Sequence, residues 1–158
     1  MKRLLVSTIA LSTLLVLPAA FGQDPMPAKM RPAKAAERQA AINSIQSQLK
    51  AFGRGDYKTA VTYQSAGLKK SFPSTDAFRA MMVRTYPEFA HYKTVTFGPA
   101  QADPAGAHLV LLASVTGQDG VTVKAVYLMV REGKVYRVEG VAGGAQLPLE
   151  DSGPSRDV

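Results

Sequence analysis

The sequence contains no cysteine, and this absence excludes several kinds of site. Without a thiol, the chain forms no disulfide bond, has no cysteine nucleophile and holds no metal through cysteine. A bacterial lipoprotein also needs a cysteine directly after its signal peptide, where the lipid is attached. The sequence therefore predicts a protein without a lipid anchor, soluble after export.

Histidine and acidic residues are also scarce. The chain has two histidines, His91 and His108, and 12 acidic against 19 basic residues, a net charge of +7. No HExxH motif or comparable spacing of ligands is present, so no metal and no cofactor are predicted. A basic protein that leaves the cytoplasm does not meet nucleic acid, which excludes that partner. Binding to anionic cell-envelope surfaces through Lys69, Lys70 and Arg84 is a weaker alternative.

The first 22 residues have the pattern of a secretory signal peptide. Lys2 and Arg3 precede an apolar stretch, and Ala20-Phe21-Gly22 places small residues where a signal peptidase cuts, before Gln23. An uncleaved anchor is the alternative, but a membrane span needs about 20 predominantly apolar residues. We expect a secreted or periplasmic bacterial protein that meets the membrane only through this transient segment.

The mature chain divides into three parts. Residues 23–33 are rich in proline and predict a flexible leader. Residues 34–142 carry periodic apolar patterns and predict one domain, which is long enough to fold without disulfides. Residues 143–158 combine glycine, proline and scattered charges, which is typical of a disordered tail.

The first half of the domain predicts three helices. Apolar residues at intervals of three and four predict a helix from Ala33 to Phe52, ended by the glycines that follow it. Asp56 is expected to cap a short helix. Ser74 or Thr75 is expected to cap a third helix, which Pro87 prevents from continuing.

The second half predicts four antiparallel strands, at residues 92–97, 108–116, 121–131 and 134–141. Two-residue hairpin loops at Asp119-Gly120 and Glu132-Gly133 would set the register. That register pairs Val110 with Met129 and Leu112 with Tyr127 on an apolar face packed under the helices. The opposite face has an apolar centre, which predicts either a homodimer through this outer face or partial cover by the tail.

The comparison with known families depends on the segments Ile45–Phe52, Gly55–Tyr57, Phe78–Val83, Tyr86-Pro87, Val95–Gly98 and Val138–Gly140. These segments and the order of the predicted elements resemble the cone-shaped fold of nuclear transport factor 2-like (SnoaL-like) proteins, and within them the bacterial family called domain of unknown function 4864. The resemblance implies an α+β fold with three N-terminal helices packed on a curved four-stranded antiparallel sheet. It implies no established activity.

A cone fold has a pocket between its helices and the concave sheet face, and the sequence predicts no carboxylate there. We therefore expect a non-enzymatic domain, without catalytic residues, that binds a small apolar ligand or a protein partner. The expected pocket lining is Val110, Leu112, Tyr127, Met129, Tyr136 and Phe78. The alternative is an enzyme of the isomerase or hydro-lyase type, with His91, His108 or Asp56 as its base beside Tyr127.

Overall fold

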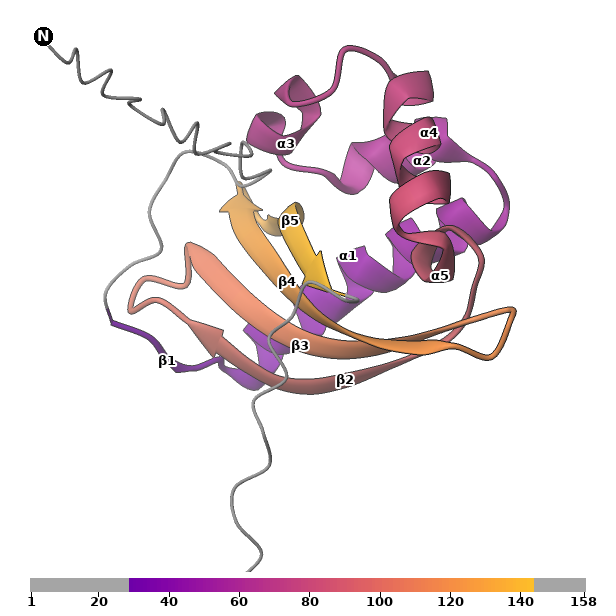
Figure 1. Cartoon of the computed structure of the whole chain (residues 1–158). Coiled ribbons are helices and arrows are strands. Elements are labelled where there is room, and N and C mark those ends of the chain that lie inside the picture. Colours follow the sequence, from indigo (N-terminus) through magenta and orange to yellow (C-terminus); the bar gives the residue numbers. More distant parts are fainter. Residues whose placement is uncertain (1–28, 144–158) are drawn as a thin grey trace, which may run out of the picture.

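The computed structural model describes residues 29–143 and has an α+β architecture, in which helices pack on one curved antiparallel sheet (Figure 1). The predicted signal peptide, most of the predicted leader and all of the predicted tail except Gly143, which ends β5, lie outside the described residues. No helix among residues 29–143 is long and apolar enough to cross a membrane.

The sheet has five strands in the order β1-β2-β3-β4-β5, so each strand pairs with its neighbour in sequence. Its strands are β1 (Arg31–Pro32), β2 (Tyr92–Ala102), β3 (His108–Gly117), β4 (Thr122–Glu132) and β5 (Val135–Gly143). The prediction of four strands was one short, because Arg31 and Pro32 pair with the end of β2 and do not belong to a free leader. A proline fits there because an edge strand leaves one side without ladder bonds.

The helical part has more elements than the three predicted helices. It consists of α1 (Ala35–Gly53), α2 (Tyr57–Ala60), the 3₁₀ helix η1 (Val61–Tyr63), α3 (Ala66–Lys70), α4 (Thr75–Thr85) and α5 (Pro87–Ala90). The long helix α1 crosses one face of the sheet (Figure 1). The short helices α2, η1 and α3 follow it and lead to α4.

Local sequence signals explain where α1 ends and where α4 begins. After α1, Gly55 has φ of 69°, and the amides of Gly55 and Asp56 bond the carbonyls of Phe52 and Ala51 at 2.8 and 2.9 Å. This left-handed exit is one that glycine adopts without strain. At α4 the hydroxyl of Ser74 accepts from the amide of Ala77 at 3.1 Å, so Ser74 is the cap.

The predicted register between β3 and β4 is wrong by one residue. Gly117 pairs with Val121 across the three-residue loop 118–120, in which Gly120 has φ of 83°, and not across a two-residue loop. An odd shift exchanges the two faces of a strand. Val110 therefore pairs with Leu128, not Met129, and Leu112 pairs with Val126, not Tyr127.

The register between β4 and β5 differs by two residues, so the faces are as predicted. The predicted loop Glu132-Gly133 would pair Met129 with Tyr136, but the loop is Gly133-Lys134 and Met129 pairs with Val138. A bulge then leaves Glu139 without a partner between Val138 and Gly140.

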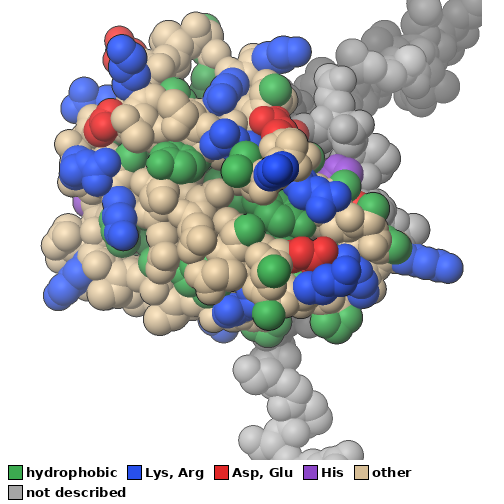
Figure 2. Space-filling view, turned by 180° about the vertical axis from the view of Figure 1, so that it is seen from behind, with side chains coloured by type: hydrophobic (Ala, Val, Ile, Leu, Met, Phe, Trp, Pro, Cys, Tyr) green, Lys and Arg blue, Asp and Glu red, His purple; other side chains and the backbone are tan. Residues whose placement is uncertain are grey.

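The core lies between the helices and the inner face of the sheet. The sheet contributes Leu109, Leu111, Ala113, Val115, Ala125, Tyr127, Met129, Tyr136 and Val138, all buried, and α1 contributes Ala41, Ile42, Ile45, Leu49, Ala51 and Phe52. The outer face is less covered, since Leu112 is 45% exposed. Lysine and arginine side chains outnumber acidic ones on the surface seen in Figure 2.

Candidate functional site: a cleft between α3 and α4

A cleft of about 220 Å³ opens where the chain turns from η1 through α3 into α4. Its walls combine apolar side chains with amide, hydroxyl and ammonium groups. The lining residues are Val61, Gln64, Lys69, Phe72, Ser74, Thr75 and Phe78.

The back of the cleft is attached to the sheet. Gln64 forms an isolated parallel bridge with Val138 of β5, and the amide of Ser65 donates to the carbonyl of Val138 at 2.9 Å. The hydroxyl of Ser65 then accepts from the amide of Leu68 at 2.9 Å and begins α3. These bonds bury Gln64 and Ser65, each 1% exposed.

The side chain of Gln64 is the most unusual feature of the cleft. Its Nε2 is buried and has no hydrogen-bond partner among the described residues. Leaving a buried donor without a partner costs about 1–3 kcal/mol, so native proteins rarely do so. By contrast, the other buried glutamine of the helical region, Gln48, donates to the carbonyl of Ala60 at 3.3 Å. The fold therefore keeps an unused donor beside the cleft.

Two features that carry positive charge border the cleft. Lys69 lies in the last turn of α3, and the N-terminus of α4 begins at Ser74 and Thr75 on the facing wall. The amides of Thr75 and Asp76 have no hydrogen-bond acceptor among residues 29–143. A helix N-terminus carries a partial positive charge. No acidic side chain lines the cleft, although Asp76 lies nearby in the first turn of α4.

The remaining walls are apolar. The rings of Phe72 and Phe78 meet edge to face with centroids 5.0 Å apart, and Val61 completes this side. Such a combination of aromatic walls and a few polar groups is typical of small-molecule sites.

Of the six residues predicted to line a pocket, Phe78 lines this cleft. Tyr127, Met129 and Tyr136 are 1%, 1% and 3% exposed in the core between sheet and helices. Burial raises the pKa of the Tyr127 phenol far above its ordinary value. Because the register differs by one, Val110 and Leu112 lie on the outer face of the sheet.

The three predicted bases lie apart from the cleft. His91 is exposed at the end of α5, and Asp56 accepts from the amide of Thr59 at 3.0 Å as the cap of α2. His108 begins β3, where its Nδ1 lies 3.0 Å from Oδ2 of Asp103. None of the three is among the residues that line the cleft.

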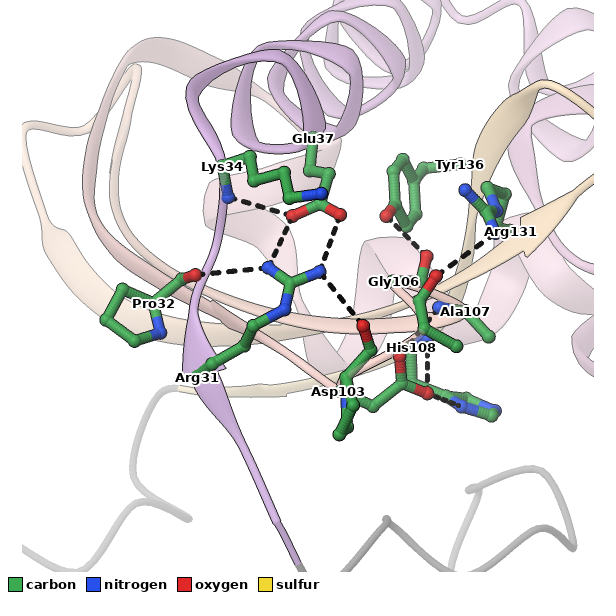
Figure 3. A network of polar contacts seen from close by, with 12 residues as sticks. Arg31, Pro32, Lys34, Glu37, Asp103, Gly106, Ala107, His108, Arg131 and Tyr136 are labelled. Carbon is green, nitrogen blue, oxygen red and sulfur yellow. Dashed lines mark hydrogen bonds and ion pairs between the residues drawn. The ribbon is translucent and has the colours of Figure 1, made fainter.

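The contact between Asp103 and His108 belongs to a second polar cluster, at the end of the sheet where β1 and α1 begin (Figure 3). Asp103 is 6% exposed and also accepts from the amides of Ala107 and His108, at 2.7 and 3.2 Å. Burial alone would raise the pKa of Asp103, but these hydrogen bonds outweigh it and lower the pKa.

The same cluster joins the loop between β2 and β3 to β1, α1 and β5. Arg31 forms two parallel bonds to Glu37, at 2.8 and 2.9 Å, and Glu37 also accepts from the amide of Lys34 at 2.8 Å. The bonds from Arg31 and Lys34 lower the pKa of Glu37 to about 2. The hydroxyl of Tyr136 donates to the carbonyl of Gly106 at 2.6 Å. The carboxylates of Asp103 and Glu37 are thus occupied by the fold itself.

Among residues 29–143 no three histidine or acidic side chains gather closely enough to hold a metal ion. Of the basic residues considered above for binding anionic surfaces, Lys69 lines the cleft, whereas Lys70 and Arg84 do not. In the structure the guanidinium of Arg79 lies 5.7 Å from the centroid of the Tyr57 ring and does not line the cleft. Gln64 was missed, because no local pattern distinguishes a buried glutamine in a loop.

Comparison with known proteins identifies the family. The sequence of residues 34–146 matches the family described as domain of unknown function (DUF4864), and this match covers most of the chain. The chain belongs to the DUF4864 family. No curated protein matches this DUF4864 chain.

A crystal structure of a protein from Kribbella flavida DSM 17836, described as a protein of known function without naming it, is similar to this DUF4864 chain. The similarity covers 66% of this chain and 85% of the other, with 18% sequence identity and a TM-score of 0.41. No activity follows from a similarity at this level.

Proposed function

We propose that this DUF4864 protein is an exported, non-enzymatic domain of the nuclear transport factor 2-like type that binds a small ligand in the cleft between α3 and α4. Two observations on Gln64 carry the proposal: its buried Nε2 has no partner among the described residues, and the residue lines a cleft with aromatic walls. A bound ligand would supply the missing acceptor and offset the cost of burying the amide.

The size of the cleft limits the ligand. An engineered apolar cavity of about 150 Å³ binds benzene, so a cleft of about 220 Å³ suits a compound with a single ring. The walls on the side of Phe72 and Phe78 favour an apolar body over a sugar or a polar peptide.

A fragment screen followed by amide chemical shifts tests this proposal. We expect at least one fragment to shift the amides of residues 64–78 in a saturable way. Thr75→Phe, which fills the cleft from one wall, should abolish those shifts, whereas Thr85→Phe at the exposed far end of α4 should leave them unchanged. If no fragment shifts these amides, or if the shifts survive Thr75→Phe, the proposal is wrong.

Export is part of the proposal and is supported by the basic, apolar and small-residue segments of residues 1–22. We expect protein recovered from the periplasm or the medium to begin at Gln23. Recovery of the chain in the cytoplasm with an intact N-terminus would contradict export.

An enzyme is the second candidate, because Asp103 could orient His108 as a base. His108 lies at the start of β3 and does not line the cleft, so the enzyme has less support than the binding protein. If a small ligand exchanged a carbon-bound proton with D₂O in the presence of the native protein, and not with His108→Gln, the enzyme would be favoured.

We also propose that the outer face of the sheet mediates a homodimer. Its centre pairs Val110 with Leu128 and Leu112 with Val126, so a second copy of the same apolar patch could cover it by two-fold symmetry. Leu112→Lys should then convert a dimer into a monomer in light scattering, while Val83→Lys, an equally exposed site on α4, should not. A monomeric native protein would contradict this proposal.

A further inference from the structure

We infer that the ligand of the α3–α4 cleft is a small carboxylate with an apolar body. The carboxylate would be received by Gln64, Lys69 and the N-terminus of α4. This inference rests on the proposed function and names the chemical class that the cleft would bind.

The first observation is the character of the unpaired group. Gln64 is 1% exposed, and the atom without a partner is Nε2, a donor. A donor requires an acceptor, which a carboxylate oxygen provides. Because Nε2 itself has almost no exposed surface, contact with a ligand requires the Gln64 amide to turn toward the cleft.

The second observation is the N-terminus of α4, an 11-residue helix. The amides of Thr75 and Asp76 donate no hydrogen bond to another described residue, while the amide of Ala77 is taken by Ser74. Helix N-termini with free amides bind anions, since both the N–H groups and the helix dipole favour negative charge. This terminus and Gln64 border the same cleft.

The third observation is the charge of Lys69. Its side chain lines the cleft, and no carboxylate of the described residues lies within ion-pair distance of it. Two acidic groups lie at the other end of α3: Glu132 accepts from the amide of Ala66 at 2.7 Å, and Glu139 lies beside Gly67. The charge of Lys69 at the cleft is therefore available to an anion.

The apolar walls decide between an organic and an inorganic anion. Phe72, Phe78 and Val61 would offer nothing to a free phosphate or sulfate, but they would bury the hydrocarbon part of a carboxylic acid. Ser74, whose oxygen accepts from Ala77, can still donate its hydroxyl proton to the ligand.

Benzoate and benzamide form a matched pair of probes, because they share size and ring and differ in charge. We expect benzoate to bind the exported chain with a Kd on the order of 1 mM, and benzamide to bind at least tenfold more weakly. In chemical-shift titrations benzoate should move the backbone amides of Thr75 and Asp76 and the side-chain amide of Gln64. Inorganic phosphate should neither bind there nor displace benzoate.

Matched variants assign the contacts. Lys69→Met and Gln64→Leu should each weaken benzoate binding about tenfold, because each removes one donor to a charged acceptor. Lys70→Met, the next residue on α3, and Gln48→Leu, the buried glutamine with a partner, should leave it unchanged. Lys69 is exposed, so its variant folds and the test stands even where a buried substitution does not fold.

The outcomes separate this inference from the proposed function. If benzamide binds as well as benzoate and Lys69→Met has no effect, the cleft binds ligands but the carboxylate assignment is wrong. If phosphate displaces benzoate, the assignment of an apolar body is wrong. If neither these probes nor any fragment shifts the amides of residues 64–78, the proposed function itself fails.

Discussion

Two polar regions of this protein are built in opposite ways. At the end of the sheet, buried Asp103 accepts three hydrogen bonds, from two backbone amides and from His108. At the cleft, buried Gln64 leaves its Nε2 without any partner in the described structure. The first arrangement stabilises a loop and needs nothing more, whereas the second costs stability unless something binds. Complete pairing thus points to a structural role, and incomplete pairing points to a ligand.

The largest expected effect is at Asp103. Asp103→Ala should lower the free energy of unfolding by about 3 kcal/mol, because it leaves buried donors unpaired at the start of β3. Urea denaturation measures the change. Asp119→Ala removes a carboxylate that accepts one exposed bond from Val121, and it should cost less than about 1 kcal/mol. If both variants lost the same free energy of unfolding, the buried bonds of Asp103 would contribute no more than the exposed bond of Asp119.

A smaller loss is expected at Tyr136. Tyr136→Phe deletes the buried bond to the carbonyl of Gly106 and should lower the free energy of unfolding by about 1–1.5 kcal/mol. Tyr63→Phe serves as control, since the Tyr63 hydroxyl has no hydrogen bond within residues 29–143. A Tyr136→Phe variant as stable as the native protein would mean that this bond does not hold the loop.

The comparison is sharpest for the two buried glutamines. Without ligand, Gln64→Leu should raise the free energy of unfolding by up to about 1 kcal/mol, because it removes an unpaired buried donor. Gln48→Leu removes a paired amide and should lower it by about 1 kcal/mol. Thermal and urea unfolding of both variants measure the difference. A loss in both would show that Gln64 has a partner in solution.

The smallest effect is the dependence on pH at the paired cluster. The folded pKa of Glu37, about 2, lies below the ordinary value of 4.5, so the charged form favours folding above pH 4.5. This contribution is lost as the pH falls from 4.5 to 2. The stability difference between the native protein and Glu37→Gln should therefore shrink over that range in urea titrations. A difference that is constant with pH would contradict the ion pair with Arg31.

Local signals in the sequence predicted much of the fold. Gly55, Ser74 and Pro87 each act through their own backbone or side chain, so the limits of α1, α4 and α5 follow from neighbouring residues. The four long strands follow from their period of two. Loop length was the error: Asp119-Gly120 fits a two-residue turn as well as the end of a three-residue loop, and the second is formed.

The candidate site was less predictable than the fold. Phe78 was expected to line a pocket between the helices and the sheet, but it lines the cleft between α3 and α4. Lys69 was considered only as part of a basic surface, and it lines the same cleft. Gln64 was not expected, because its burial is produced by the bridge to Val138, which is 74 residues away in sequence. The same holds for Asp103 and His108, whose contact depends on the conformation of a loop that looks unremarkable in sequence.

The sequence by itself determined the absence of thiol chemistry, the order of the long helices and strands, and membership of the DUF4864 family. These depend on residue identity and on contacts between near neighbours. Only the tertiary structure decided which face of β3 is buried and that Gln64, Lys69 and the start of α4 border one cleft. The reason is that a cleft forms where separate elements meet, and a buried polar atom is paired or unpaired according to residues that lie far away in the chain.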